Sequence, residues 1–252
     1  MSTTALILLI ILFFVTSAVG VVTGSNSLIT VPVMFQFGID PKVAVATNMF
    51  GLTFMSIGAT IPFVKQKAID YKRISPLVLL TIVGSALGAL LVGLISTKTI
   101  PIIVSVSMIV VTIFTFIKRD AGIAKVENVS PNSHTITYVL TFLLGIFGGL
   151  YSGGYVTMLT ACFVAFFGMT FSEAVANTKF INIFSSSIAT LIFMWQGLVD
   201  YKLGAILAVT MFIAAYLGAK TVTKLNDLWL KRIFLATVLL LALKTIFDFT
   251  IK

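Results

Sequence analysis

The sequence has few charged residues, and this scarcity excludes most classes of soluble protein. Only 10% of the 252 residues are Asp, Glu, Lys or Arg, whereas 59% are hydrophobic. A soluble domain carries about 25% charged and about 45–50% apolar residues. Several apolar runs reach the roughly 20 residues that a helix needs to cross the hydrocarbon core of a bilayer. The composition therefore predicts an all-α polytopic membrane protein, embedded in the lipid bilayer of the cell (plasma) membrane as a multi-pass protein.

Residues that carry chemistry are equally scarce. The chain has one cysteine, Cys162, and one histidine, His134, which excludes an internal disulfide and a Cys/His metal site. Nothing resembles a catalytic dyad or a phosphate-binding loop, so we expect no enzyme activity, no cofactor and no metal. The formal charge of +9 comes from basic residues between the apolar segments. This placement is typical of the cytoplasmic loops of membrane proteins, and we expect no nucleic-acid partner.

One long stretch occurs twice. Residues 44–72 and 174–202 share thirteen identical positions at a constant spacing, for example Asp70 and Asp200 (200 − 70 = 130). Near the N-terminus a second set recurs at a spacing of 125, in which Gly20, Gly24, Ser27 and Val31 correspond to Gly145, Gly149, Ser152 and Val156. The duplication predicts two homologous halves, with residues 1–118 as the first transmembrane repeat, 119–133 as a polar linker and 134–252 as the second repeat. Because the N-terminal segment recurs inside the chain, we interpret it as a membrane helix and not as a signal peptide.

Each half is expected to contain a broken or re-entrant segment followed by three spanning helices. The breaks are predicted at residues 23–27 and 148–154, where glycine and polar residues interrupt apolar runs. The apolar pieces that follow, residues 28–37 and 156–167, are too short to cross a bilayer alone. Each is either a half helix or one arm of a hairpin with the preceding run.

Charge placement bears on how the two halves are oriented. The first half has a basic loop at residues 65–73, whereas the basic cluster of the second half lies one helix later, at residues 220–232. If positive loops are cytoplasmic, the halves are inverted repeats; the alternative is parallel halves. Gly84 and Gly88, like Ala214 and Gly218, place small residues one turn apart. This spacing suits close helix packing, either within the chain or in a homodimer.

Interrupted helices in matching positions of two repeats indicate a secondary transporter whose site lies near the bilayer midplane. The exposed N–H groups and positive dipole ends of such breaks suit a small anionic substrate. Lys179 lies inside a predicted spanning helix, where a lysine costs about 2.5–3.5 kcal/mol on insertion scales, and its counterpart in the first half is Met49. We interpret Lys179 as the counter-charge for the anion; the alternatives are snorkelling and a structural pair. The predicted substrate-binding residues are Ser25, Asn26, Ser27, Thr47, Asn48, Tyr151, Ser152, Gly153, Asn177, Thr178 and Lys179.

These features together resemble the sulfite exporter TauE/SafE family. The similarity rests on the Gly/Ser-rich breaks, the short apolar segments, and the Gly-x5-Ala spacing that leads into a helix at Gly38–Ala44 and Gly168–Ala174. It covers essentially the whole chain, most clearly residues 20–62 and 145–190, but the usual glycine-rich tract of the first half is here Gly24-Ser25-Asn26-Ser27. The resemblance implies transport of sulfur-containing anions such as sulfite and organosulfonates. We therefore expect a secondary transporter that works by alternating access, with an anion channel or a non-transporting structural membrane protein as the alternative.

Overall fold

The computed structural model describes residues 3–24, 26–117, 131–226, 228–230, 232, 233 and 236. Over these residues the chain is helical, with no strand. The principal helices are α1 (Thr3–Thr23), α2 (Asn26–Gln36), α3 (Pro41–Lys65), α4 (Tyr71–Leu94), α5 (Ile100–Ile117), α6 (Pro131–Leu150), α7 (Tyr155–Phe166), α8 (Phe171–Trp195) and α9 (Tyr201–Val222), with a short 3-10 helix at Thr97–Thr99. Six helices of this part of the chain are long and apolar enough to cross a membrane. The predicted all-α, multi-pass membrane fold is confirmed.

Aspartate side chains cap the starts of three long helices, α3, α4 and α9. The Asp40 carboxylate accepts hydrogen bonds from the backbone N–H groups of Lys42 and Val43, and Pro41 occupies the first turn of α3. Asp70 and Asp200, which correspond to each other in the two halves, cap α4 and α9 in the same way. Such caps satisfy N–H groups that a helix start leaves unpaired. The repeated Asp-Tyr-Lys triplets therefore set equivalent helix boundaries in both halves.

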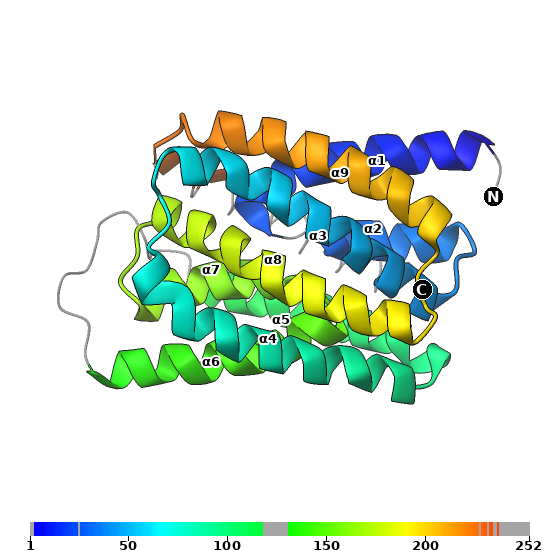
Figure 1. Cartoon of the computed structure of the whole chain (residues 1–252), viewed down its shortest axis with the longest axis horizontal. Helices are drawn as coiled ribbons and strands as arrows, with labels where there is room; N and C mark the ends of the chain where they lie inside the picture. The colour runs from blue at the N-terminus through cyan, green and yellow to red at the C-terminus, as the bar shows by residue number, and fades with distance from the viewer. Residues whose placement is uncertain are drawn as a thin grey trace.

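The two breaks are helical hairpins. Gly24 adopts a φ of 67°, and the chain turns back so that the Asn26 side-chain amide donates to the Ser17 hydroxyl at 2.7 Å. Nine residues of continuous helix would separate these groups by about 13 Å, so α2 folds back along α1. In the second half Gly154 has a φ of 84° and the Tyr155 ring packs against Gly148, which brings α7 back along α6. The hairpin form of the predicted broken segment is therefore the one observed (Figure 1).

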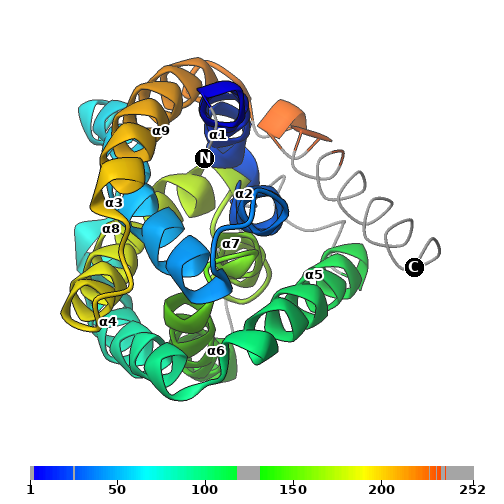
Figure 2. The same ribbon diagram turned by 90° about the vertical axis from the view of Figure 1, so that its right-hand side faces the viewer.

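Corresponding helices of the two halves run antiparallel. The backbone N–H of Asp70 donates to the Asn177 side chain at 3.1 Å, and that of Asp200 donates to the Thr47 hydroxyl at 3.0 Å. Because Thr47 and Asn177 are themselves 130 positions apart, the two hydrogen bonds are equivalent. The end of α3 thus lies beside the start of α8, and the end of α8 beside the start of α3 (Figure 1). The packing of helix pairs shows the same correspondence between the halves (Figure 2). Helix α3 packs on α9, and its counterpart α8 packs on α4. Likewise α1 packs on α9, and α6 packs on α4.

Glycines on α4 and α9 allow close approach of these helix pairs. A β-carbon at Gly88 would overlap the carbonyl oxygen of Ile146 on α6, and one at Gly84 would lie 2.6 Å from the carbonyl oxygen of Phe142. On α9, Gly218 is pressed against the backbone of Ala18 on α1. The small residues singled out in the sequence therefore pack within the chain, and a homodimer remains a prediction.

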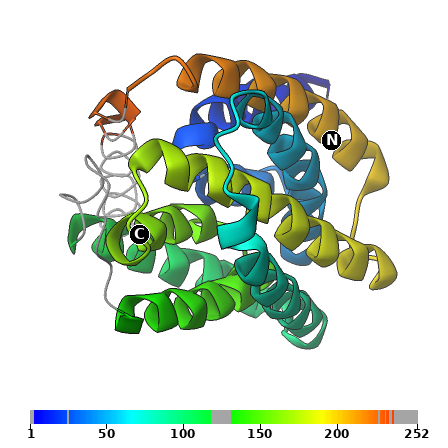
Figure 3. The same cartoon turned by 60° about the vertical axis from the view of Figure 1, so that its left-hand side comes forward.

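The two ends of the helix bundle differ in charge. The Gln66 side chain donates to the carbonyl of Thr223 at 3.3 Å, so residues 65–73 and 220–224 lie at the same end. Figure 3 turns this end, which we call the basic end, toward the viewer. In the part of the chain that the structure describes, its exposed lysines include Lys65, Lys67, Lys72, Lys220 and Lys224, and Arg73, Asp70 and Glu173 also lie at this end. The opposite end carries Lys42, Lys98 and Lys202 beside Asp40 and Asp200.

Candidate functional site

The starts of the two short helices meet at the centre of the molecule. The hydroxyl groups of Ser27, at the start of α2, and Ser152, just before α7, are 2.7 Å apart. The Tyr151 hydroxyl donates to the carbonyl of Ser27 at 2.8 Å, and the Thr157 hydroxyl donates to the carbonyl of Thr23 at 2.6 Å. A helix N-terminus has unpaired N–H groups and the positive end of its dipole. Two such ends therefore point toward one junction, which we call the hairpin junction.

A small cavity of about 10 Å³ adjoins the hairpin junction. It is lined by Gly20, Gly24, Asn26, Ser27, Leu52, Met55, Ser152, Val156, Lys179 and Asn182. This volume is close to the minimum that holds one water molecule. A cavity of this size has no room for a molecule much larger than water.

Lys179 reaches this cavity from α8. Its side chain is 3% exposed, and its Nζ donates to the carbonyl oxygen of Gly20 at 2.7 Å. The start of α8 is fixed by a capping box between Thr170 and Glu173, which holds the Glu173 carboxylate at the helix start. The ammonium group therefore points into the protein, at the last turn of α1.

Two amide side chains connect the region of the junction to neighbouring helices. Asn48 on α3 donates from its Nδ2 to the Ser27 hydroxyl at 2.8 Å and accepts at its Oδ1 from the Thr30 hydroxyl at 2.9 Å. Asn182, one turn after Lys179, donates to the Ser56 hydroxyl at 2.7 Å. These bonds join α2, α3 and α8, so the polar groups near the cavity are held in fixed orientations.

The predicted site residues do not all gather here. Asn26, Ser27, Ser152 and Lys179 line the cavity, and Asn48 and Tyr151 contact Ser27 directly. Thr47 and Asn177 lie instead at the helix junctions described above, where they bind the N–H groups of Asp200 and Asp70. The Thr178 hydroxyl pairs with that of Thr160 at 3.1 Å, and Gly153 lies against the Tyr151 ring. Ser25 is outside the described residues.

Comparison with known proteins places this fold in a family. Residues 8–245 match the family model described as "Sulfite exporter TauE/SafE". The chain belongs to the TauE/SafE family. It is 26% identical over 236 residues to "Probable membrane transporter protein ORF9" of a Sinorhizobium species, covering 93% of this chain and 90% of that one. It is also 25% identical over 251 residues to "Probable membrane transporter protein YfcA" of Escherichia coli K12, covering 96% and 91% of the two chains.

A more distant relative, "Probable membrane transporter protein YunE" of Bacillus subtilis, is 23% identical over 234 residues, covering 87% of this chain and 85% of the relative. No solved structure matches the chain. Family membership and the names of these relatives indicate a membrane transporter and not an enzyme.

Several lining residues of this TauE/SafE protein were not among the predicted site residues: Gly20, Gly24, Leu52, Met55, Val156 and Asn182. A pattern in the sequence could have identified some of these residues. Gly20, Gly24 and Val156 belong to the set that recurs at a spacing of 125, and Asn182 follows Lys179 at a helical spacing of three. Leu52 and Met55 have no such signal, because apolar residues fill most of α3.

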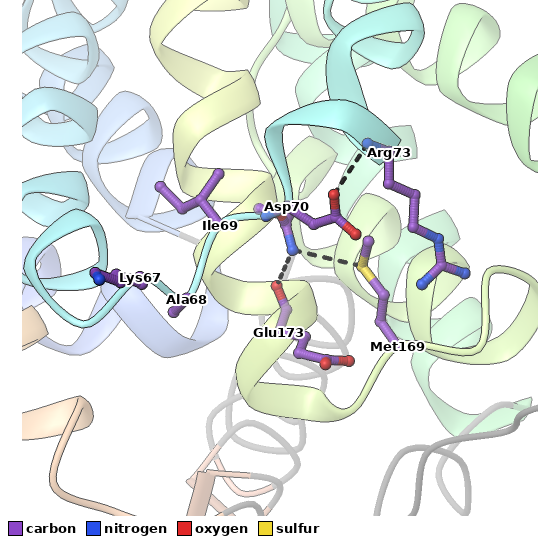
Figure 4. Close-up of a pocket in the computed structure, with 8 residues that line it drawn as sticks. Lys67, Ala68, Ile69, Asp70, Arg73, Met169 and Glu173 are labelled. Carbon is purple, nitrogen blue, oxygen red and sulfur yellow. Dashed lines mark hydrogen bonds between the residues drawn. The ribbon is translucent and has the colours of Figure 1, made fainter.

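A larger pocket of about 400 Å³ opens at the basic end (Figure 4). It lies between the loop that precedes α4 and the start of α8, and Lys67, Asp70, Arg73, Glu173 and Asn177 line it. The Asn177 amide donates to the carbonyl of Glu173 at 2.8 Å, and the Arg73 guanidinium lies 4.1 Å from the centre of the Phe167 ring and donates to the carbonyl of that residue. This pocket has charges of both signs, whereas the cavity at the hairpin junction has one cationic group and neutral polar groups.

The chemistry of the junction suits an anion. Two helix N-termini, one lysine and several neutral donors converge there, and none of the ten residues that line the cavity is acidic. Within the described residues no cluster of His, Cys, Asp or Glu could hold a metal ion. Binding by charge and hydrogen bonds is therefore the function that these groups support.

Proposed function

We propose that this TauE/SafE protein is a secondary transporter that moves a small sulfur-containing anion, sulfite or an organosulfonate, across the plasma membrane. The observation that carries the proposal is the meeting of the α2 and α7 N-termini beside the buried ammonium of Lys179. Helix N-termini bind oxyanions through their N–H groups, and a fixed cation adds attraction in a region of low dielectric constant. The family description supports sulfite as the first substrate to examine.

We infer further that the two halves are inverted repeats and that they exchange access between the two sides of the membrane. Two observations support this: α3 and α8 run antiparallel, and the equivalent hydrogen bonds Asp70–Asn177 and Asp200–Thr47 are exchanged between the halves. Secondary transporters with inverted repeats bind substrate near the midplane and rock one repeat against the other. The basic end, with its excess of lysines, is assigned to the cytoplasm.

Flux measurements test the proposal. The purified full-length chain is reconstituted in liposomes, and uptake of labelled sulfite, thiosulfate, sulfate, methanesulfonate and acetate is compared. We expect saturable uptake of sulfite or the sulfonate, together with counterflow, in which unlabelled anion inside accelerates entry of labelled anion. A channel would give flux without counterflow, and the absence of any anion flux would contradict transport altogether.

A further inference from the structure

We propose that Lys179 is the coupling site of the transporter and that it carries one proton together with each monovalent anion. This inference rests on the proposed function and names the ion that accompanies the substrate. It begins from the hydrogen bond between the Lys179 Nζ and the carbonyl oxygen of Gly20, at 2.7 Å.

The position of this nitrogen is that of a coupling cation. Gly20 lies in the last turn of α1, directly before the break, and its carbonyl also accepts the N–H of Gly24 at 2.9 Å. In transporters with broken helices, the carbonyl groups at the C-terminal end of a half helix coordinate the coupling Na⁺ or H⁺. Here the ammonium of a side chain takes that place. A proton bound by the amine, and not a free Na⁺, is therefore the cation that this helix end would hold.

Among the described residues, none that lines the cavity is acidic, so none of them balances the charge of Lys179 there. The acidic residues of the whole chain are Asp40, Asp70, Asp120, Glu127, Glu173, Asp200, Asp227 and Asp248. Among those that the structure describes, Asp40, Asp70 and Asp200 cap helices at the bundle ends, and Glu173 lies in the first turn of α8.

The residues of the other described elements that line the cavity with Lys179 are neutral. α1 and α2 contribute Gly20, Asn26 and Ser27, and α3 contributes Leu52 and Met55. The second hairpin contributes Ser152 and Val156 to the cavity wall. The hydroxyl of Tyr151, in the same hairpin, donates a hydrogen bond to the carbonyl of Ser27. Lys179 is therefore the group at this cavity that can gain or lose a charge.

Burial makes two states of the cavity favourable. An isolated charge in the middle of a membrane protein is costly, whereas a neutral amine alone or an ammonium beside a bound anion leaves no net charge. Binding of a proton and binding of a monovalent anion therefore strengthen each other, because each removes the cost that the other imposes.

The transport step follows from this balance. On one side, the Lys179 amine takes a proton from water through its lone pair, and the anion binds beside the resulting ammonium. The closed complex is neutral. On the other side, the anion leaves and the ammonium returns its proton to water. One proton and one monovalent anion thus cross in the same direction, with no net charge transferred.

The experiment uses the reconstituted full-length protein with methanesulfonate, which remains a monovalent anion over the working pH range, so that any proton movement belongs to the protein. A pH-sensitive dye inside the vesicles reports protons while labelled methanesulfonate reports the anion. We expect one proton per anion and a flux that does not change when the membrane potential is clamped at different values with valinomycin and potassium. Anion flux without a pH change, or flux that requires Na⁺, would overturn the proposal.

A variant with a permanent charge separates coupling from folding. In Lys179→Arg the guanidinium cannot release its proton, so the empty carrier cannot return. Exchange of labelled for unlabelled methanesulfonate at equal concentrations should persist, whereas net uptake should fall at least tenfold. Met49→Leu, at the corresponding position of the first half, is the matched control and should leave the ratio of net uptake to exchange unchanged.

The outcomes also distinguish a failure of the proposed transport function from a failure of the proton coupling. The ratio of net uptake to exchange is also measured with labelled sulfite. Sulfite itself can bind a proton, but this ratio compares two fluxes of the same anion and so does not depend on its protonation. A wild-type protein that moves neither anion contradicts the proposed function and the proton coupling with it. A wild-type protein that transports either anion while the arginine variant keeps its ratio contradicts the coupling alone.

Discussion

The hydroxyl groups of Ser27 and Ser152 lie 2.7 Å apart, although 125 residues separate them in the chain. The two serines correspond to each other in the repeated pattern; Ser27 is the second residue of α2, and Ser152 lies in the turn before α7. Contact between corresponding residues is what a two-fold relation produces at its axis. The contact thus supports the proposed inverted repeats, and it lies at the hairpin junction, beside the proposed binding site.

The two serines should not be equally important. Ser27 also accepts the Asn48 amide, so Ser27→Ala leaves both Asn48 and Ser152 without this partner, whereas Ser152→Ala leaves the Asn48 bond intact. A buried polar group without a partner costs about 1–3 kcal/mol. We expect a clearly lower melting temperature for purified Ser27→Ala than for Ser152→Ala. Equal melting temperatures of the two variants would show that the hydrogen bond from Asn48 to Ser27 contributes nothing to thermal stability.

Gly24 is expected to tolerate no side chain. It combines a φ of 67° with close contact, because a β-carbon there would lie 2.7 Å from the backbone nitrogen of Thr157. Gly38 has a similar φ of 76° but nothing within 4 Å of that position. Gly24→Ala should therefore lose transport and separate the hairpins, whereas Gly38→Ala should cost only about 1 kcal/mol of stability from backbone strain. Thermal unfolding and sulfite flux of the two variants, measured side by side, test this difference.

Lys179→Met, which installs the residue found at the corresponding position of the first half, should weaken anion binding at least tenfold, or about 1.4 kcal/mol. The fold should survive, because methionine has a similar length and the Gly20 carbonyl keeps its bond from Gly24. Titration of the purified variant with sulfite and methanesulfonate gives the affinity, and size-exclusion chromatography gives the folding control. Unchanged affinity in a well-folded variant would assign Lys179 a structural role.

The inverted arrangement predicts which loops share a side of the membrane. Cys162 is buried and unpaired, so Cys162→Ala should provide a cysteine-free background. On that background, Lys67→Cys and Lys224→Cys should react with an impermeant maleimide from one side, and Lys202→Cys from the other. Labelling of Lys67→Cys and Lys224→Cys from opposite sides of intact cells would contradict the inverted arrangement of the two halves.

Much of the fold was predictable from the sequence for simple physical reasons. The scarcity of charge fixes a membrane environment, and the length of the apolar runs fixes spanning helices. The two Asp-Tyr-Lys triplets mark helix starts, because the aspartate of each one caps a helix, α4 or α9. The breaks were also visible in the sequence, since Gly24 and the glycines near residue 150 interrupt apolar segments.

The membership of the site was only partly predictable. Thr47, Asn177 and Thr178 share the chain neighbourhood of Asn48 and Lys179, but successive residues of a helix point about 100° apart. Thr47 and Asn177 consequently face the neighbouring helix junctions, where they pair with the starts of α9 and α4. They are close to the site residues in the sequence, but the rotation of the helix directs their side chains to other contacts.

The sequence by itself determined that the chain is helical and membrane-embedded, and it predicted a duplication in which Lys179 corresponds to Met49. Only the tertiary structure decided what that lysine touches. Its partner, Gly20, is 159 residues away and belongs to the other half, and the two come together because α8 packs beside the last turn of α1. A contact of this kind depends on how two folded hairpins fit against one scaffold, and no local pattern of residues encodes it.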